Sequence, residues 1–407
     1  MEPRLRLRRF ILGMMAGLPR TNCWSLAEHA GETCPRGMQR LLSSASWDED
    51  GVLNDVRNWV VAQLGAPDGI LVIDETGDLK KGTATVGVQR QYTGTAGRIE
   101  NCQVAVYLTY ATSKGHALID RALYLPRSWT ENTERMSAAG VPEDTAFATK
   151  PALAQRLITD ALAAEVPARW VAGDEVYGSD SKLRKHLRKN GLGYVLAVAK
   201  NHQISTGIGD RRAIDLAVRL RPHHWQRLSA GSGSKGERWY DWAVIDTTDD
   251  AADPTATSTG HHWLLIRRNR STGELAFYRA YSPTKVPISA LVKVAGRRWT
   301  IEESFAASKE LAALDEHQVR KWTSWQRWTA LAILAHAFLS IMAATEPAPT
   351  TATGLIQLTR NEIRRLLTAA LTPVHHIEHV IHWSTWRRQH QARARISHYA
   401  RRAALGD

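Results

Sequence analysis

Apolar residues are spaced in two ways along this chain, and the change of spacing separates predicted helices from a predicted sheet. Between residues 52 and 64 they recur at helical spacing, which predicts a helix that ends at Gly65. The same spacing predicts helices at residues 4–17, 24–31 and 36–45, so residues 1–66 form a predicted N-terminal helical domain. The continuous apolar run at residues 70–73 is instead typical of a strand buried on both faces of a sheet.

Strand and helix patterns alternate from residue 67 to residue 204, the predicted first part of a core domain. Two strands are expected at residues 104–111 and 116–125, antiparallel across a turn at 112–115. A helix at 151–164, a strand at 169–173, a helix capped by Ser179 and a strand at 194–199 follow. This order predicts an α/β fold with a mixed five-stranded sheet and helices on its faces.

Residues 205–290 interrupt that alternation and are predicted to form a β-rich insertion. Its strands are expected at 239–247, 262–268 and 275–281, and its loops at 231–234 and 249–260. Helices at 288–296, 300–314 and 323–344 then place the second part of the core at residues 291–345. Residues 346–407 are predicted to hold a linker at 347–351 and two helices, the second rich in arginine. The apolar stretch at 331–344 is too short for a membrane span and predicts a buried helix.

The charge balance favours a polyanionic partner. The 407 residues include 53 Lys and Arg against 40 Asp and Glu, a net charge of +13, and the sequence pI is about 9.8. Several tryptophans stand beside an arginine, and Trp299 is one of them; such a pair can stack on a base and hold a phosphate, or it can be a core tryptophan beside a surface arginine. The three cysteines lack zinc spacing and predict a reducing, intracellular environment.

Two aspartates, Asp74 and Asp174, each follow an apolar predicted strand. Acids at the carboxyl ends of strands lie where open α/β sheets bind ligands, although an aspartate there can also simply form a turn. Because strand ends of one sheet can lie side by side, the two carboxylates are candidates to share a divalent cation such as Mg²⁺ or Mn²⁺. Alternation along the strand directs Glu75 to the side opposite Asp74.

Glu302 is the third candidate acid, at the start of the predicted helix at 300–314. Lys309 follows it by seven residues and therefore shares its helix face, while Arg298 lies just before the helix. Thr300 and Glu303 have the spacing of a capping box, which would give Glu303 a structural role and leave Glu302 free. Three carboxylates with Arg298, Lys309 and Lys200 nearby suit phosphodiester chemistry with two divalent ions.

These residues resemble a known family. The order of Asp74, Asp174, the β-rich insertion and Glu302 is similar to that of the DDE transposases of bacterial insertion sequences. Arg298, Glu302 and Lys309 are spaced as in the Tyr–Arg–Glu–Lys signature of that family, whose tyrosine position is Ala295 here. Further motifs resemble the insertion-sequence-701 group: residues 24–31 (WSLAEHAG), 73–77 (IDETG), 87–97 (GVQRQYTGTAG) and 172–178 (AGDEVYG).

The resemblance implies an RNase H-like core in which Asp74, Asp174 and Glu302 bind two Mg²⁺ or Mn²⁺ ions and catalyse cleavage at the element ends and 3′-hydroxyl strand transfer. It also implies that Arg298 and Lys309 contact DNA, and we expect Lys200 and Trp299 to do so as well. The N-terminal domain at residues 1–66 is expected to bind DNA or to brace the core. The arginine-rich tail helix is expected to contact phosphates or to form a solvated face. The implied partners are the terminal inverted repeats and target DNA, bound by a homodimer in the bacterial cytoplasm at the nucleoid, with no membrane. Two alternatives stay open: a non-catalytic DNA-binding regulator on the same fold, and a metal-dependent nuclease without strand transfer.

Overall fold

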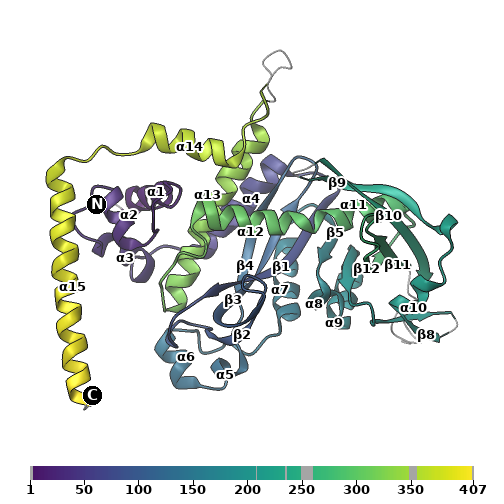
Figure 1. Cartoon of the computed structure of the whole chain (residues 1–407), viewed down its shortest axis with the longest axis horizontal. Helices are drawn as coiled ribbons and strands as arrows, with labels where there is room; N and C mark the ends of the chain where they lie inside the picture. The colour runs from purple at the N-terminus through teal and green to yellow at the C-terminus, as the bar shows by residue number, and fades with distance from the viewer. Residues whose placement is uncertain (1–2, 208, 234–235, 249–259, 348–354, 406–407) are drawn as a thin grey trace.

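The apolar run at residues 70–73 lies within a large mixed sheet in the computed structural model, which describes residues 3–207, 209–233, 236–248, 260–347 and 355–405. The sheet has ten strands in the order β2-β3-β1-β5-β6-β12-β11-β10-β9, with β4 paired to β3 (Figure 1). Its strands are β1 (Gly69–Leu79), β2 (Gln89–Thr93), β3 (Arg98–Ala111), β4 (His116–Leu123), β5 (Ala168–Gly173), β6 (Gly193–Val198), β9 (Gln226–Gly233), β10 (Gly236–Thr247), β11 (His261–Arg268) and β12 (Leu275–Ser282). A separate two-stranded sheet holds β7 (Gln203–Thr206) and β8 (Gly209–Arg212).

The first half of the sheet has the mixed arrangement that the sequence predicts. Strand β3 is antiparallel to both β1 and β4, while β5 is parallel to β1 and β6 is parallel to β5. The predicted α/β class is therefore confirmed. Both β1 and β3 are longer than predicted, because each continues past its apolar run into polar residues that still pair with each other.

The β-rich segment extends this sheet, which is therefore larger than the five strands predicted. Strand β12 pairs antiparallel with β6, and β11, β10 and β9 follow outward in turn. Without β12, the edge of β6 would expose unpaired backbone groups, and pairing removes that cost. The loop predicted at 249–260 and the linker predicted at 347–351 lie almost wholly outside the described residues.

Helices cover the sheet and form the ends of the chain. The N-terminal helices are α1 (Pro3–Met14), α2 (Cys23–His29), α3 (Arg36–Ser43) and α4 (Glu49–Leu64). Those between strands are α5 (Arg127–Thr130), α6 (Thr133–Ala139), α7 (Lys150–Ala163), α8 (Glu175–Gly178), α9 (Ser181–Lys189) and α10 (Ala213–Val218). The later ones are α11 (Ile288–Arg297), α12 (Trp299–Ala312), α13 (Trp322–Thr345), α14 (Arg360–Leu371) and α15 (Ile377–Leu405). The predicted cap of α9 was wrong, because Asp180 and not Ser179 accepts the capping hydrogen bond.

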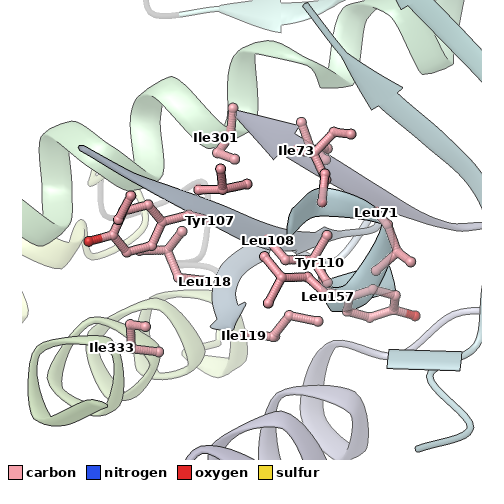
Figure 2. Close-up of a cluster of buried hydrophobic side chains, with 14 of the residues drawn as sticks. Leu71, Ile73, Tyr107, Leu108, Tyr110, Leu118, Ile119, Leu157, Ile301 and Ile333 are labelled. Atoms are coloured by element: carbon pink, nitrogen blue, oxygen red, sulfur yellow. The ribbon is translucent and has the colours of Figure 1, made fainter. Parts of the chain in front are cut away.

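One hydrophobic core joins the N-terminal helices to the sheet. Phe10, Leu26 and Met38, from three of those helices, are buried in the same cluster as Ile73 of β1. Helices α7 and α12 both pack on β1, β3 and β4. In Figure 2, Ile301 of α12 lies near Ile73 within that cluster. The N-terminal helices therefore brace the sheet, whatever else they do.

Helix α13 crosses this core. By length and composition alone it could span a membrane, but 67% of its most apolar window is buried inside the protein. It packs against α4, α12 and β4, so its apolar side chains are core residues. This confirms the prediction that the apolar stretch at 331–344 forms a buried helix.

The tail leaves the core and runs along the N-terminal helices. Figure 1 shows α15 as a long rod at the side of the molecule away from the β-rich segment. Its first turns are fixed to the end of α2: His379 contacts the carbonyl oxygen of Glu28 at 2.9 Å, and the indole of Trp383 donates to that of Glu32 at 2.9 Å. Arg387 adds an ion pair with Glu28 at 2.5 Å.

Candidate active site

Strand register brings the two aspartates to one edge of the parallel ladder. In the pairing of β1 with β5, Ile73 is the partner of Gly173, and the ladder ends there. Asp74 and Asp174 are the next residues on their strands, so they lie at the same edge. The prediction that β1 ends before Asp74 was wrong, because β1 stays paired with β3 up to Leu79. Only the pairing of β1 with β5 stops before Asp74.

Local hydrogen bonds orient both carboxylates. Asp174 is the N-cap of α8 and accepts from the backbone N–H of Val176 at 2.9 Å. Asp74 accepts from the backbone N–H of Glu75 at 2.8 Å. These bonds hold each carboxylate close to its own backbone at the open end of the ladder.

Helix α12 carries the third acid. Its apolar residues Ile301, Phe305 and Ala312 are buried, and this leaves Glu302 facing away from the core. The predicted capping box was wrong: Arg298 is the N-cap residue, and no side chain caps the helix. Glu303 is instead held by His116, whose Nε2 lies 3.2 Å from its carboxylate.

The three acids line one cavity of about 610 Å³. The side chains around it come from β1, the β2–β3 hairpin, the start of α7, the segment after β5, and α12. They include Asp74, Glu75, Thr76, Tyr92, Thr95, Lys150, Asp174, Val176, Glu302, Phe305 and Lys309. Sequence spacing had placed Glu302 and Lys309 on one face, and both do line this cavity.

Arg298 lies among the acids and is bonded to two of them. Its Nη2 is 2.5 Å from Oε1 of Glu302, and its Nη1 is 3.5 Å from Oδ2 of Asp74. Burial opposes the charge on Arg298, but the neighbouring Glu302 and Asp74 carboxylates raise its pKa above the ordinary value. The guanidinium therefore stays positive where negative charges converge.

Burial and neighbouring carboxylates raise the pKa values of Asp74 and Asp174. Burial raises the pKa of Asp74 to about 8, with the charges of Asp174 and Glu75 adding to the effect and Arg298 opposing it. The pKa of Asp174 is also raised, first by burial and then by Glu75. Like charges that share a buried site disfavour their ionised forms, so this cavity favours a bound cation.

Glu75 also lines this cavity, although β1 pairs with β3 without a bulge and so directs successive side chains to opposite faces. Its carboxylate accepts from Lys150 at 2.6 Å and from the hydroxyl of Tyr177 at 2.6 Å. Both partners were missed. Lys150 is the first residue of α7 and Tyr177 lies in the short helix α8, and nothing in the sequence at either position indicates a contact with Glu75.

The candidate cations and the candidate tryptophan differ in position. Lys309 donates to the hydroxyl of Thr76 at 2.8 Å and lies 3.4 Å from that of Thr95, so it sits at the cavity wall. Lys200 and Trp299 are not among the lining residues. Lys200 is exposed after β6, and Trp299 is 47% exposed at the first position of α12.

The donor set suits a hard divalent cation, since every acid in the cavity offers carboxylate oxygens. Among the residues described, no three Asp, Glu, His or Cys side chains are arranged closely enough to hold a metal ion. Arg298 supplies positive charge between Asp74 and Glu302 instead. The residues therefore fit such an ion in their chemistry, and binding one requires the guanidinium to move.

Two family models match parts of this chain. Residues 2–208 match the family model described as DDE superfamily endonuclease, and residues 148–338 match the model described as Transposase DDE domain. A curated protein of Microchaete diplosiphon, the probable transposase for insertion sequence element IS701, is 31% identical over 198 residues. That alignment covers 47% of this chain and 48% of the relative. The chain therefore spans about half the length of this curated relative.

Among solved structures, the chain is similar to a piggyBac transposase in a synaptic complex with hairpin DNA. The TM-score is 0.43 at 13% sequence identity, and the match covers 91% of this chain and 71% of that one.

Proposed function

The chain belongs to the DDE superfamily endonucleases, and on that premise we propose that it is a DNA transposase of the insertion-sequence type. It cuts DNA at the ends of its element and joins the 3′-hydroxyl ends to target DNA. The observation that carries this proposal is the convergence of Asp74, Asp174 and Glu302 on one cavity, with Lys309 on its wall. The likeness to the IS701 protein supports the same substrate class.

The strand arrangement supports an RNase H-like core. On one side, β1 pairs antiparallel with β3, which in turn pairs antiparallel with β4. On the other side lie β5 and β6, which run parallel to β1. Asp74 lies on β1, the central strand of this set, and Asp174 follows the neighbouring strand β5. The proposed RNase H-like core therefore has both aspartates at one edge, where the proposed chemistry needs them.

Asp74, Asp174 and Glu302 would hold the divalent ions, Mg²⁺ or Mn²⁺. When bound, such ions activate the attacking oxygen and stabilise the leaving oxygen of a phosphodiester. In the proposed reaction, water attacks first and the freed 3′-hydroxyl attacks second at the same site. Lys309 is placed to hold a phosphate of the bound strand, and Arg298 can contact another once it leaves the acids.

The proposed partners are the terminal repeats of the element and the target DNA. The net charge of +13 favours such a polyanion. Lys200 and Trp299, which lie outside the cavity, would contact DNA beyond the scissile phosphate. A homodimer holding two element ends, in the bacterial cytoplasm at the nucleoid, completes the proposal.

A cleavage assay on labelled duplexes that carry the element ends tests this function. We expect nicking that needs Mg²⁺ or Mn²⁺ and is abolished by Asp74→Asn, Asp174→Asn or Glu302→Gln, while filter-binding affinity for the same DNA stays within a few-fold of wild type. A variant that still cuts removes its residue from the catalytic set.

Two further observations separate the alternatives. A DNA-binding regulator would bind the ends with no nicking under any divalent ion. A nuclease without strand transfer would cut, yet would fail to join pre-cleaved ends with free 3′-hydroxyls to a target plasmid. The transposase must do both.

A further inference from the structure

An exposed apolar pair stands at the rim of the acidic cavity. Tyr92 of β2 lines the cavity and is 62% exposed, and its cross-strand partner Ile99 of β3 is 59% exposed. Arg90, two residues earlier on β2, is exposed as well. Strand β2 ends the sheet, where exposed apolar side chains are a liability unless something binds them.

The hairpin that carries this pair is fixed to the cavity. At its tip, the hydroxyl of Thr95 donates to the carbonyl oxygen of Gly77 at 2.9 Å and lies 3.3 Å from the hydroxyl of Thr76. Lys309 of α12 reaches the same Thr95 hydroxyl at 3.4 Å. The hairpin is thus tied to both β1 and α12, while Tyr92 keeps most of its surface in solvent.

A cation and an aromatic ring at this rim match the phosphate and the base of a nucleotide. Lys309 offers a cation to a phosphate, and Tyr92 offers an aromatic face beside it. Stacking of a base on an aromatic ring does not depend on base identity, because every base has a π-face. We propose that Tyr92, backed by Ile99, stacks on the nucleobase next to the phosphate cut by the acids, an inference that rests on the function proposed above.

This placement has a consequence for substrate choice. Bases inside a continuous duplex are stacked on each other, so their faces are closed to a side chain. Tyr92 therefore binds a base that is unpaired or at a strand end, and favours DNA already opened beside the scissile phosphate over an intact duplex.

Fluorescence of 2-aminopurine tests the contact directly. The probe is a duplex that carries the element end and one unpaired base beside the scissile phosphate. The unpaired base is 2-aminopurine, on one side of that phosphate in the first duplex and on the other side in a second duplex. In the Glu302→Gln background, which keeps the DNA uncut, we expect binding to change the fluorescence at one of these positions. Adding Tyr92→Ala should abolish that change, and Tyr92→Phe should keep it.

Kinetics supply the second readout. In the otherwise wild-type chain, Tyr92→Ala should lower kcat/KM for cleavage about tenfold, chiefly through KM, while Tyr92→Phe stays near wild type. Val218→Ala is the control for loss of an exposed apolar side chain, because Val218 is 79% exposed on α10 and does not line the cavity. If Tyr92→Ala unfolds, Tyr92→Leu keeps apolar bulk without a ring and should show the same loss.

The outcomes separate this inference from the function beneath it. If the wild-type chain does not cut element ends, the proposed function fails. If it cuts, but Tyr92→Ala matches wild type in both fluorescence and kinetics, only the stacking contact is overturned. An equal loss in Val218→Ala would also overturn it, since the effect would then not be specific to the rim.

Discussion

Replacing Asp74 by Asn should stabilise the metal-free protein, and the gain should depend on pH. In the unfolded chain Asp74 loses its proton near its ordinary pKa of 3.8, whereas burial and the charges of Asp174 and Glu75 raise the pKa in the folded chain to about 8. Between these values the folded state binds more protons than the unfolded state, so this residue lowers stability as pH rises.

The size of the effect follows from the shift. At pH 7 the folded chain keeps a proton that the unfolded chain has released, a cost of at most about 4 kcal/mol at 1.36 kcal/mol per pKa unit. Relaxation and water in the cavity reduce it, so we expect Asp74→Asn to raise the free energy of unfolding by about 1–4 kcal/mol at pH 8 and by almost nothing at pH 4. Against a typical total of about 5–15 kcal/mol, that gain is measurable.

Urea unfolding followed by tryptophan fluorescence, with a chelator present, measures this difference at a series of pH values. Asp55→Asn is the control, because Asp55 is exposed on α4 and away from the cavity. A difference between Asp74→Asn and wild type that is the same at every pH, or a variant less stable than wild type at pH 8, would refute the electrostatic reasoning. Mg²⁺ should then stabilise wild type and leave Asp74→Asn unchanged, since only the folded wild-type site binds it.

Three further experiments test the core, the buried contact between Asp78 and His317, and the tail helix. Ile301→Ala should lower the free energy of unfolding by about 2–5 kcal/mol in urea titrations, because its side chain is fully buried between α12 and the sheet. Asp78→Asn should cost about 3 kcal/mol by the same measurement, because the buried His317 ring donates to Asp78 across 3.0 Å. Changing Arg388 and Arg395 on the exposed side of α15 to Gln should flatten the salt dependence of DNA affinity by about two units of slope; an unchanged slope would leave these arginines solvated.

The acids could be found from the sequence because their positions follow from backbone order. An apolar run that ends in an acid occurs at both Asp74 and Asp174, and the parallel pairing of Ile73 with Gly173 then fixes the two at one edge. Glu302 and Lys309 share a helix face by spacing alone. None of these relations depends on how distant side chains pack.

Polar strands and long-range partners could not be found in this way. Strand β2 has a polar sequence, and it exists because β3 offers it an edge. Glu75 alternates with Asp74 along β1, and its long-range partners Lys150 and Tyr177 could not be read from that alternation. Similarly, Glu303 fits a local capping pattern and instead finds His116, which is far away in sequence.

Charge balance explains the place of Arg298. Three carboxylates that face one cavity repel one another, so a cation must lie among them. Lys150 is held by Glu75 and Lys309 by threonine hydroxyls, which leaves Arg298 as the cation that contacts both Asp74 and Glu302 among the residues described. Because Arg298 precedes Glu302 by four residues at the start of one helix, the same short segment supplies an acid of the site and the charge that neutralises it. The spacing of that pair therefore serves the charge balance of the cavity as well as any contact with a phosphate.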